Sequence, residues 1–124
     1  MRTLKTVSVS KSNKGVLFTF TVKSHEFHNN TERNKFFRAL YGWKQIVPTE
    51  KKEYVYDREG LLDEVPHLKI DQSSFIVPEN DFDRIFEFFD EWSKKVMSRN
   101  FKVLLEEDDM EKMFEPEEEE EDEG

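Results

Sequence analysis

Basic side chains that recur through the first half of the chain are the most coherent candidates for chemistry. They lie between two expected strands, along the first expected helix and ahead of a later strand. The candidate phosphate-binding set holds nine cations and one indole: Lys11, Lys14, Lys23, Arg33, Lys35, Arg38, Lys44, Lys51, Lys52 and Trp43. If they share one side of the fold, they can contact nucleic-acid phosphates while Trp43, Tyr41 or Tyr54 stacks on a base. The alternative is that they are ordinary surface charges.

Residues with catalytic or metal-binding potential are more scattered. Histidines and carboxylates come together in two loose groups: His25, Glu26 and His28, and Asp63, Glu64 and His67. Neither group has the spacing of a complete ligand set, and hydrolytic carboxylates need a rigid supporting shell that the pattern does not indicate. The chain has no Cys and only four Gly, so thiolate chemistry and a glycine-rich phosphate loop are excluded. We predict a non-catalytic protein without metal or cofactor, with a metal-dependent nuclease as an alternative.

Charge divides the chain into a body and a tail. Residues 106–124 contain thirteen Asp or Glu and one Lys, a net charge of −12, whereas residues 1–105 sum to +3. Self-repulsion and the lack of apolar surface predict a disordered tail. Three roles stay open for it: solubility, competition with nucleic acid for the basic body, and docking to a partner. Docking would use the i, i+3, i+4 spacing of Met110, Met113 and Phe114, which suits a short amphipathic helix in a groove.

The elements that must position these residues are readable from hydrophobic periodicity. Residues 3–10 and 16–22 alternate as two strands, and Ser-Asn-Lys-Gly between them predicts a hairpin turn. A helix should have Asn30 or Thr31 as its N-cap, bury Phe36 and Leu40, and end at Gly42. Strands are expected around residues 54–56 and 68–77, on either side of an acidic loop. A second helix should begin at residue 80 or 81, and residues 101–105 should form the last strand.

After the first strand this order is β-α-β-β-α-β, which is typical of a ferredoxin-like antiparallel sheet with two helices on one face. The predicted fold is therefore α+β, with one domain at residues 1–105, an extra N-terminal strand and a disordered acidic tail at residues 106–124. No secretion signal or membrane-spanning run is visible, so we expect a cytoplasmic protein. Charged residues make up 38% of the chain, with Lys and Glu prominent, which is typical of thermophiles.

Short motifs add a resemblance to a known family. Leu40-Tyr41-Gly42, Ser74-Phe75-Ile76, the helix from Asp81 and the closing strand resemble the small ferredoxin-like protein of CRISPR spacer acquisition and its relatives. The resemblance implies that fold, a homodimer and contact with nucleic acid. The metal-binding Asp of that family follows the first core strand. Residues 23–26 of this chain read Lys-Ser-His-Glu at that place, which argues against nuclease activity.

We therefore expect a nucleic-acid-associated binding or regulatory protein whose acidic tail modulates binding. Its partner would be nucleic acid or a protein that processes nucleic acid. An adaptor that docks a partner through the tail is the main alternative. We also expect a homodimer, because an open sheet leaves unpaired edge strands and the second helix carries more aromatic surface than one sheet covers.

Overall fold

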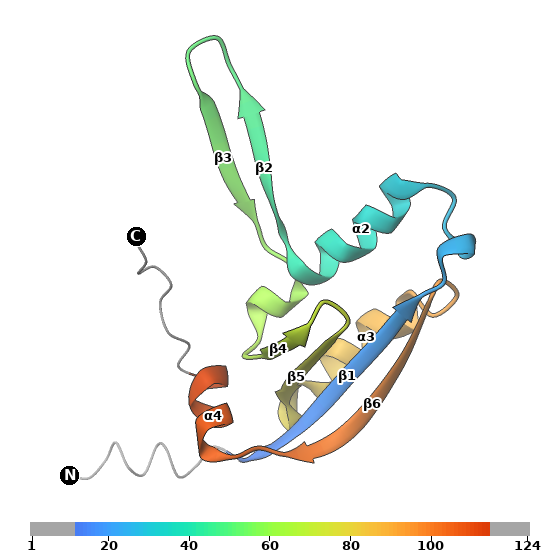
Figure 1. Ribbon diagram of the computed structural model, residues 1–124, viewed down its shortest axis with the longest axis vertical. Coiled ribbons are helices and arrows are strands. Elements are labelled where there is room, and N and C mark those ends of the chain that lie inside the picture. The colour runs from blue at the N-terminus through green and yellow to red at the C-terminus, as the bar shows by residue number, and fades with distance from the viewer. Residues whose placement is uncertain (1–11, 115–124) are drawn as a thin grey trace, which may run out of the picture.

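The computed structural model describes residues 12–114 (Figure 1). The described strands are β1 (Lys14–Val22), β2 (Trp43–Pro48), β3 (Glu53–Arg58), β4 (Leu68–Asp71), β5 (Ser74–Pro78) and β6 (Val96–Leu104). The α-helices among these residues are α2 (Asn30–Tyr41), α3 (Phe82–Glu91) and α4 (Glu107–Phe114). Short 3₁₀ helices occupy Ser24–Glu26, Leu61–Glu64 and Glu79–Asp81. Within the described part of the chain, every helix is too short or too polar to cross a membrane.

Four strands form one antiparallel sheet in the order β4-β5-β1-β6. The predicted α+β class and antiparallel sheet are confirmed. Strand β1 is central, since it pairs with β5 over Gly15–Thr19 and with β6 along its whole length. The expected strand at residues 3–10 lies outside the described residues. Strands β5 and β6 flank β1 on its two sides.

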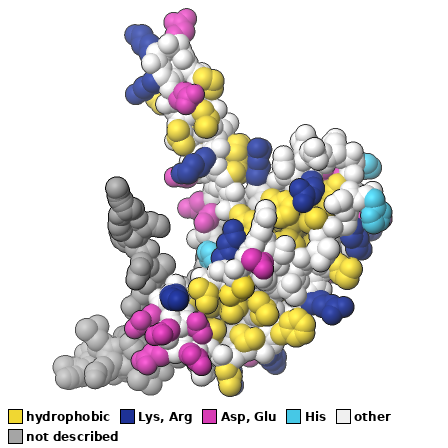
Figure 2. Space-filling model, in the orientation of Figure 1, with side chains coloured by type: hydrophobic (Ala, Val, Ile, Leu, Met, Phe, Trp, Pro, Cys, Tyr) yellow, Lys and Arg dark blue, Asp and Glu magenta, His cyan; other side chains and the backbone are white. Residues whose placement is uncertain are grey.

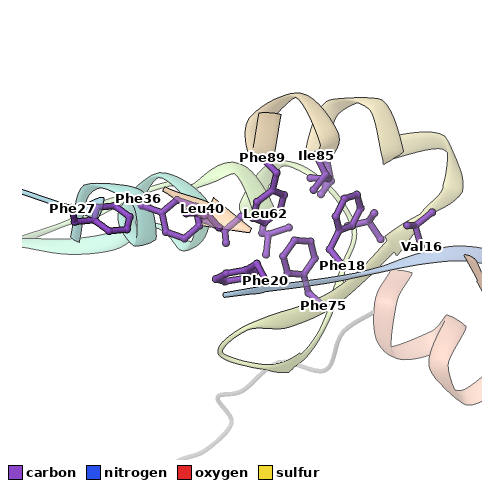
Figure 3. Packing of buried hydrophobic residues seen from close by; sticks show 13 residues of the cluster. Val16, Phe18, Phe20, Phe27, Phe36, Leu40, Leu62, Phe75, Ile85 and Phe89 are labelled. Atoms are coloured by element: carbon purple, nitrogen blue, oxygen red, sulfur yellow. The ribbon is translucent and has the colours of Figure 1, made fainter. Parts of the chain in front are cut away.

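The core lies between the sheet and the helices α2 and α3 (Figure 3). Alternate residues of β1 point into it, and Phe18 and Phe20 are almost completely buried. Phe18 stacks on Phe75 of β5 and on Phe89 of α3, with ring centroids 5.7 and 5.8 Å apart. Phe36 of α2 meets Trp92 edge to face at 5.2 Å. Burying each such side chain contributes about 2–3 kcal/mol, so the phenylalanines hold both helices on one face of the sheet.

Helix α2 begins one residue earlier than the sequence predicts. Asn29, rather than Asn30 or Thr31, is the N-cap, and its side-chain oxygen accepts from the Glu32 amide at 2.9 Å. The Glu32 carboxylate accepts from the His28 amide and from Lys95, which precedes β6. The bond from Lys95, and as a smaller effect the bond from the His28 amide, hold the pKa of Glu32 below its ordinary value. The helix ends at Gly42, as predicted.

The region of residues 43–58 departs from the prediction. Residues 54–56 were expected to form a strand of the main sheet, but β3 pairs only with β2, in a separate two-stranded hairpin that projects from the body (Figure 1). All residues of β3 are exposed. The place expected for this strand is filled by β4, which offers Leu68 as a cross-strand neighbour of Ile76. The short β4 outcompetes β3 because the chain needs only a tight turn between β4 and β5.

The prediction of a disordered acidic tail is wrong for the first part of that segment. Residues 107–114 form α4, whereas a disordered tail was expected from residue 106. The helix forms because its apolar side chains have somewhere to pack: Met113 is only 2% exposed, and α4 contacts β4. Acidic residues in the first turn suit a helix N-terminus. Met113 is therefore inaccessible to a docking partner while α4 stays folded. Residues 115–124 lie outside the described residues.

Candidate nucleic-acid interface

An open pocket of about 550 Å³ lies where α2, the base of the hairpin and the β4–β5 turn meet. Its lining residues are Asn34, Phe37, Arg38, Tyr41, Gly42, Lys69 and Gln72. Those of α2 follow the i, i+3, i+4, i+7 spacing of one helix face, beside the stripe that enters the core. Every charged group that lines the pocket is a cation. The pocket thus presents cations, amides and aromatic rings to solvent.

Each aromatic ring at this pocket has a cation over its face. The guanidinium carbon of Arg38 lies 4.0 Å from the Trp43 ring centroid, and Lys69 Nζ lies 4.2 Å from that of Tyr41. Arg33 lies 5.1 Å from the centroid of Phe37. A guanidinium stacked on a ring keeps its N–H groups at its edge, where they can donate to phosphate oxygens. The arrangement holds positive charge beside flat surfaces suited to bases.

Tyr41 joins α2 to the β4–β5 turn. Its hydroxyl donates to the Gln72 carbonyl at 2.6 Å. Burial, and then the nearby charge of Asp71, raise the pKa of Tyr41 to about 12, so the phenol stays neutral at physiological pH. Asp71 in turn accepts from the Ser74 hydroxyl and, as the smaller effect, from the Ser73 amide, both at 2.8 Å, and these bonds lower the pKa of Asp71. The turn that carries Gln72 is therefore fixed from both sides.

The hairpin continues this surface away from the body. Its register places Trp43, Gln45 and Val47 opposite Arg58, Tyr56 and Tyr54, and cross-strand partners share one face of a ribbon. We call these six residues the cation–aromatic face. Arg58 lies 5.3 Å from the Tyr56 centroid and donates from Nε to Gln45 at 2.7 Å. Lys52 lies 4.9 Å from the Tyr54 centroid. Arg58 is the one charged residue of the six, and Lys52 adds a second cation beside them.

The opposite face of the hairpin differs in chemistry. It carries Lys44, Ile46, Pro48, Glu53, Val55 and Asp57. Lys44 pairs with Asp57 at 2.9 Å, and Ile46 and Val55 are exposed. This face therefore combines one ion pair and the carboxylate of Glu53 with aliphatic surface, and it provides a matched control for experiments on the other face.

Two glycines fix the root of the hairpin against α2. Gly42 has φ 82°, a conformation that side chains disfavour. A Cβ on Gly60 would lie 2.2 Å from the Gly42 nitrogen and 2.6 Å from the Tyr41 carbonyl carbon. The Asp63 carboxylate accepts from the Gly60 amide at 2.8 Å. Backbone therefore packs directly on backbone where the hairpin leaves the body, and this sets the direction of the cation–aromatic face.

The structure brings together some of the predicted basic residues and separates others. Arg33, Arg38, Lys52 and Trp43 belong to the pocket and the hairpin surface described above. Lys51 is at the hairpin tip, and Lys44 is on the hairpin face opposite the cation–aromatic face. Lys35 is on α2 but does not line the pocket. Lys14 and Lys23 are at the two ends of β1, and Lys11 is outside the described residues.

Three residues of this surface were missed by sequence reasoning: Tyr56, Arg58 and Lys69. The period-two run Tyr54, Tyr56, Arg58 was a visible signal, because alternate residues of a strand share a face. Lys69 had no such signal, since its position over Tyr41 depends on the packing of β4 beside α2.

Charge segregation, and not net charge, defines this surface. Residues 12–105 carry fifteen acidic and fifteen basic side chains, so the +3 of residues 1–105 comes from the three cations of residues 1–11. Figure 2 shows Lys and Arg side chains around the base of the hairpin and beside α2. Asp and Glu side chains gather at α4, and others lie on the hairpin and near its base. A surface that is locally basic on a balanced body can bind phosphate without attracting every polyanion.

The histidine groups are not assembled into a site. His25 lies 3.3 Å from Glu26 and is largely exposed, and His67 Nδ1 is 3.0 Å from the Val65 carbonyl oxygen. Across residues 12–114, no three side chains of His, Asp or Glu come close enough together to hold a metal ion.

Comparison with protein-family models, curated proteins and solved structures gives no match to this chain. The resemblance to the spacer-acquisition family therefore stays an interpretation of short motifs. The arrangement that the residues themselves make is a cation-lined aromatic surface.

Proposed function

We propose that this protein binds single-stranded nucleic acid on the cation–aromatic face and the adjoining pocket. Trp43, Tyr56 and Tyr54 would stack on bases, and the cations Arg38, Arg58, Lys52 and Lys69 would contact phosphates. The single observation that carries the proposal is the pairing of each of these hairpin rings with its own cation on a face without carboxylates. Stacking and a basic track together are how sequence-tolerant single-strand binders work.

The geometry of the ribbon supports a single strand as the ligand class. Residues two apart on a strand lie about 6.6 Å apart, which leaves room for one base at each ring. A base that stacks on Tyr54 or Tyr56 would displace the cation above it, and that cation would turn to the neighbouring phosphate. A two-stranded ribbon can also enter a duplex major groove, so duplex DNA is the competitor for this face.

We further infer that the body has the ferredoxin-like arrangement. The order β4-β5-β1-β6, with α2 between β1 and β4 and α3 between β5 and β6, supports this. The hairpin is then an insertion between the first helix and the second core strand, which carries the binding surface. Residues 115–124, which hold eight Asp or Glu, would compete with nucleic acid for that surface.

The direct test measures the anisotropy of labelled oligonucleotides with the full chain. The test variant is Trp43→Ala with Tyr54→Ala and Tyr56→Ala, and the control is Ile46→Ala with Val55→Ala on the opposite hairpin face. Stacking contributes about 1–3 kcal/mol per base, so the test variant should bind a single strand at least about tenfold more weakly. The control should bind like the parent. Equal affinity of both variants, or tighter binding of duplex than of single strand by the parent, would overturn the proposal.

A further inference from the structure

The sheet face that points away from α2 and α3 carries apolar side chains. Alternation along the strands places Leu17, Leu68, Ile76, Met97 and Phe101 there, and we call these five residues the outer sheet face. Leu17 of β1 lies opposite both Ile76 and Phe101 in the register. Phe101 is 49% exposed and Met97 is 51% exposed. Half-exposed large apolar side chains grouped on one flat face indicate an interaction surface.

Helix α4 covers only one end of this face. Leu105, which leads into α4, is buried, and its Cδ1 would lie 3.3 Å from a Cβ on Gly15. The helix itself contacts β4. Met97 and Phe101 are on β6, the strand farthest from β4. Figure 2 shows hydrophobic side chains over the strands beside the acidic α4.

Charge at the two ends of the outer sheet face has opposite sign. The α4 end carries Glu107, Asp108 and Asp109 in the first helical turn. Farther from α4, Arg99 lies opposite Thr19, so it shares the face of Leu17 and stands between Phe101 and Met97 on β6. The Lys23 amide donates to the Lys95 carbonyl at 2.8 Å, so the pairing of β1 with the segment before β6 continues for one more residue. Alternation along β1 places the Lys23 side chain on the same face as Leu17. The face is therefore acidic at α4 and basic in the half that holds Arg99 and Lys23, and its apolar residues lie between and around these charges.

We propose that a second copy of this chain covers the outer sheet face. A two-fold axis in the plane of the sheet, perpendicular to this charge gradient, lays the acidic end of each copy on the basic end of the other. The apolar centres then meet, so one patch serves both partners, as an isologous interface requires. Nucleic acid does not fit this face, because the carboxylates of α4 repel phosphates and the five residues that define the face are all apolar.

The first experiment is sedimentation velocity of the full chain over a range of micromolar concentrations. The parent should be dimeric. Met97→Glu with Phe101→Glu should be monomeric, and Phe86→Glu, at a position of similar exposure (45%) on α3, should stay dimeric. Far-UV circular dichroism checks that each variant is folded. A monomeric parent, or a dimer that survives the double substitution in a folded protein, overturns the proposal.

The charge pattern allows a stricter test. Lys23→Glu with Arg99→Glu turns the basic part of the face acidic, and Asp108→Lys with Asp109→Lys turns the acidic end basic. Each double variant brings like charges together in a homodimer, so the dissociation constant of each dimer should rise at least tenfold. A mixture of the two should dimerise again, because both ends then pair opposite charges. No recovery on mixing would overturn the two-fold arrangement. If the full chain is monomeric but a chain lacking residues 1–11 forms a dimer, residues 1–11 cover the face in place of a second copy. That result would also overturn the proposal.

Discussion

The guanidinium carbon of Arg38 lies 4.0 Å from the centre of the Trp43 ring, and this stacking joins the last turn of α2 to the first residue of the projecting hairpin. Arg38 also lines the pocket between α2 and the β4–β5 turn. One side chain therefore belongs to both parts of the proposed binding surface. Its position makes the pocket and the hairpin one continuous basic and aromatic track.

Salt dependence should separate the cations of this track from other surface charges. Each phosphate contact on a single strand contributes about 0.7 to the slope of log K against log salt. Arg58→Ala with Lys69→Ala should therefore reduce that slope by about 1.4. The matched control is Lys44→Ala, because Lys44 pairs with Asp57 on the opposite hairpin face. Titrations of labelled single strands at several salt concentrations measure the slope, and equal slopes for both variants would remove Arg58 and Lys69 from the interface.

The glycines at the hairpin root should not tolerate a side chain. Gly60→Ala would place a Cβ against the backbone of Tyr41 and Gly42, so the free energy of unfolding should fall by about 1–3 kcal/mol and nucleic-acid binding should weaken. Gly15→Ala is the comparison, since its closest contact, at 3.0 Å, is a methyl carbon of Ile76. Urea unfolding followed by tryptophan fluorescence measures both. A smaller loss for Gly60→Ala than for Gly15→Ala would contradict the proposed packing of the root.

Tyr41 should make stability depend on alkaline pH. Its folded-state pKa of about 12 exceeds the ordinary value of 10.0, because burial disfavours the phenolate. The neutral phenol thus contributes stability that is fully present below pH 10 and is lost as the pH rises from 10 towards 12. Tyr41→Phe should flatten this part of the curve. It should also cost about 1 kcal/mol at neutral pH, through loss of the bond to the Gln72 carbonyl.

The alkaline measurement needs a control for the other tyrosines. Tyr54→Phe changes an exposed tyrosine of the hairpin and should keep the parental slope between pH 10 and 12. Denaturant midpoints at intervals across this range provide the data. If Tyr41→Phe and Tyr54→Phe show the same curve, the hydroxyl of Tyr41 is not the source of the dependence.

Removal of the acidic tail should tighten binding to nucleic acid. Truncation after Phe114 keeps α4, whose Met113 is buried, and removes eight carboxylates. Two groups joined by a short linker reach an effective concentration on the order of millimolar, and screening over about 8 Å at physiological salt weakens the competition. Affinity should therefore rise on truncation, most at low salt. Arg38→Glu with Arg58→Glu in the truncated chain should reverse the gain, and unchanged affinity at every salt would exclude competition by the tail.

Local periodicity was enough to predict the core elements of this protein. The alternation of Val16, Phe18 and Phe20 predicts a half-buried strand, and the helical spacing of Phe36 with Leu40 and of Ile85 with Phe89 predicts α2 and α3. These signals work because the geometry of a strand or helix decides which side chains share a face. The α+β class and the end of α2 at Gly42 could be predicted for the same reason.

The candidate site depended on tertiary structure. Tyr54 and Tyr56 alternate equally well in a main-sheet strand and in a free hairpin, and only the competition with β4 for the place beside β5 separates them. Lys69 reaches Tyr41, and Arg58 reaches Tyr56 with Gln45 opposite, only once strand register is set. Helix α4 likewise needs the sheet surface that buries Met113 to offset the repulsion of its carboxylates. The sequence by itself determined which faces are apolar, whereas long-range pairing decided which of those faces meet, because register is set by contacts between residues far apart in the chain.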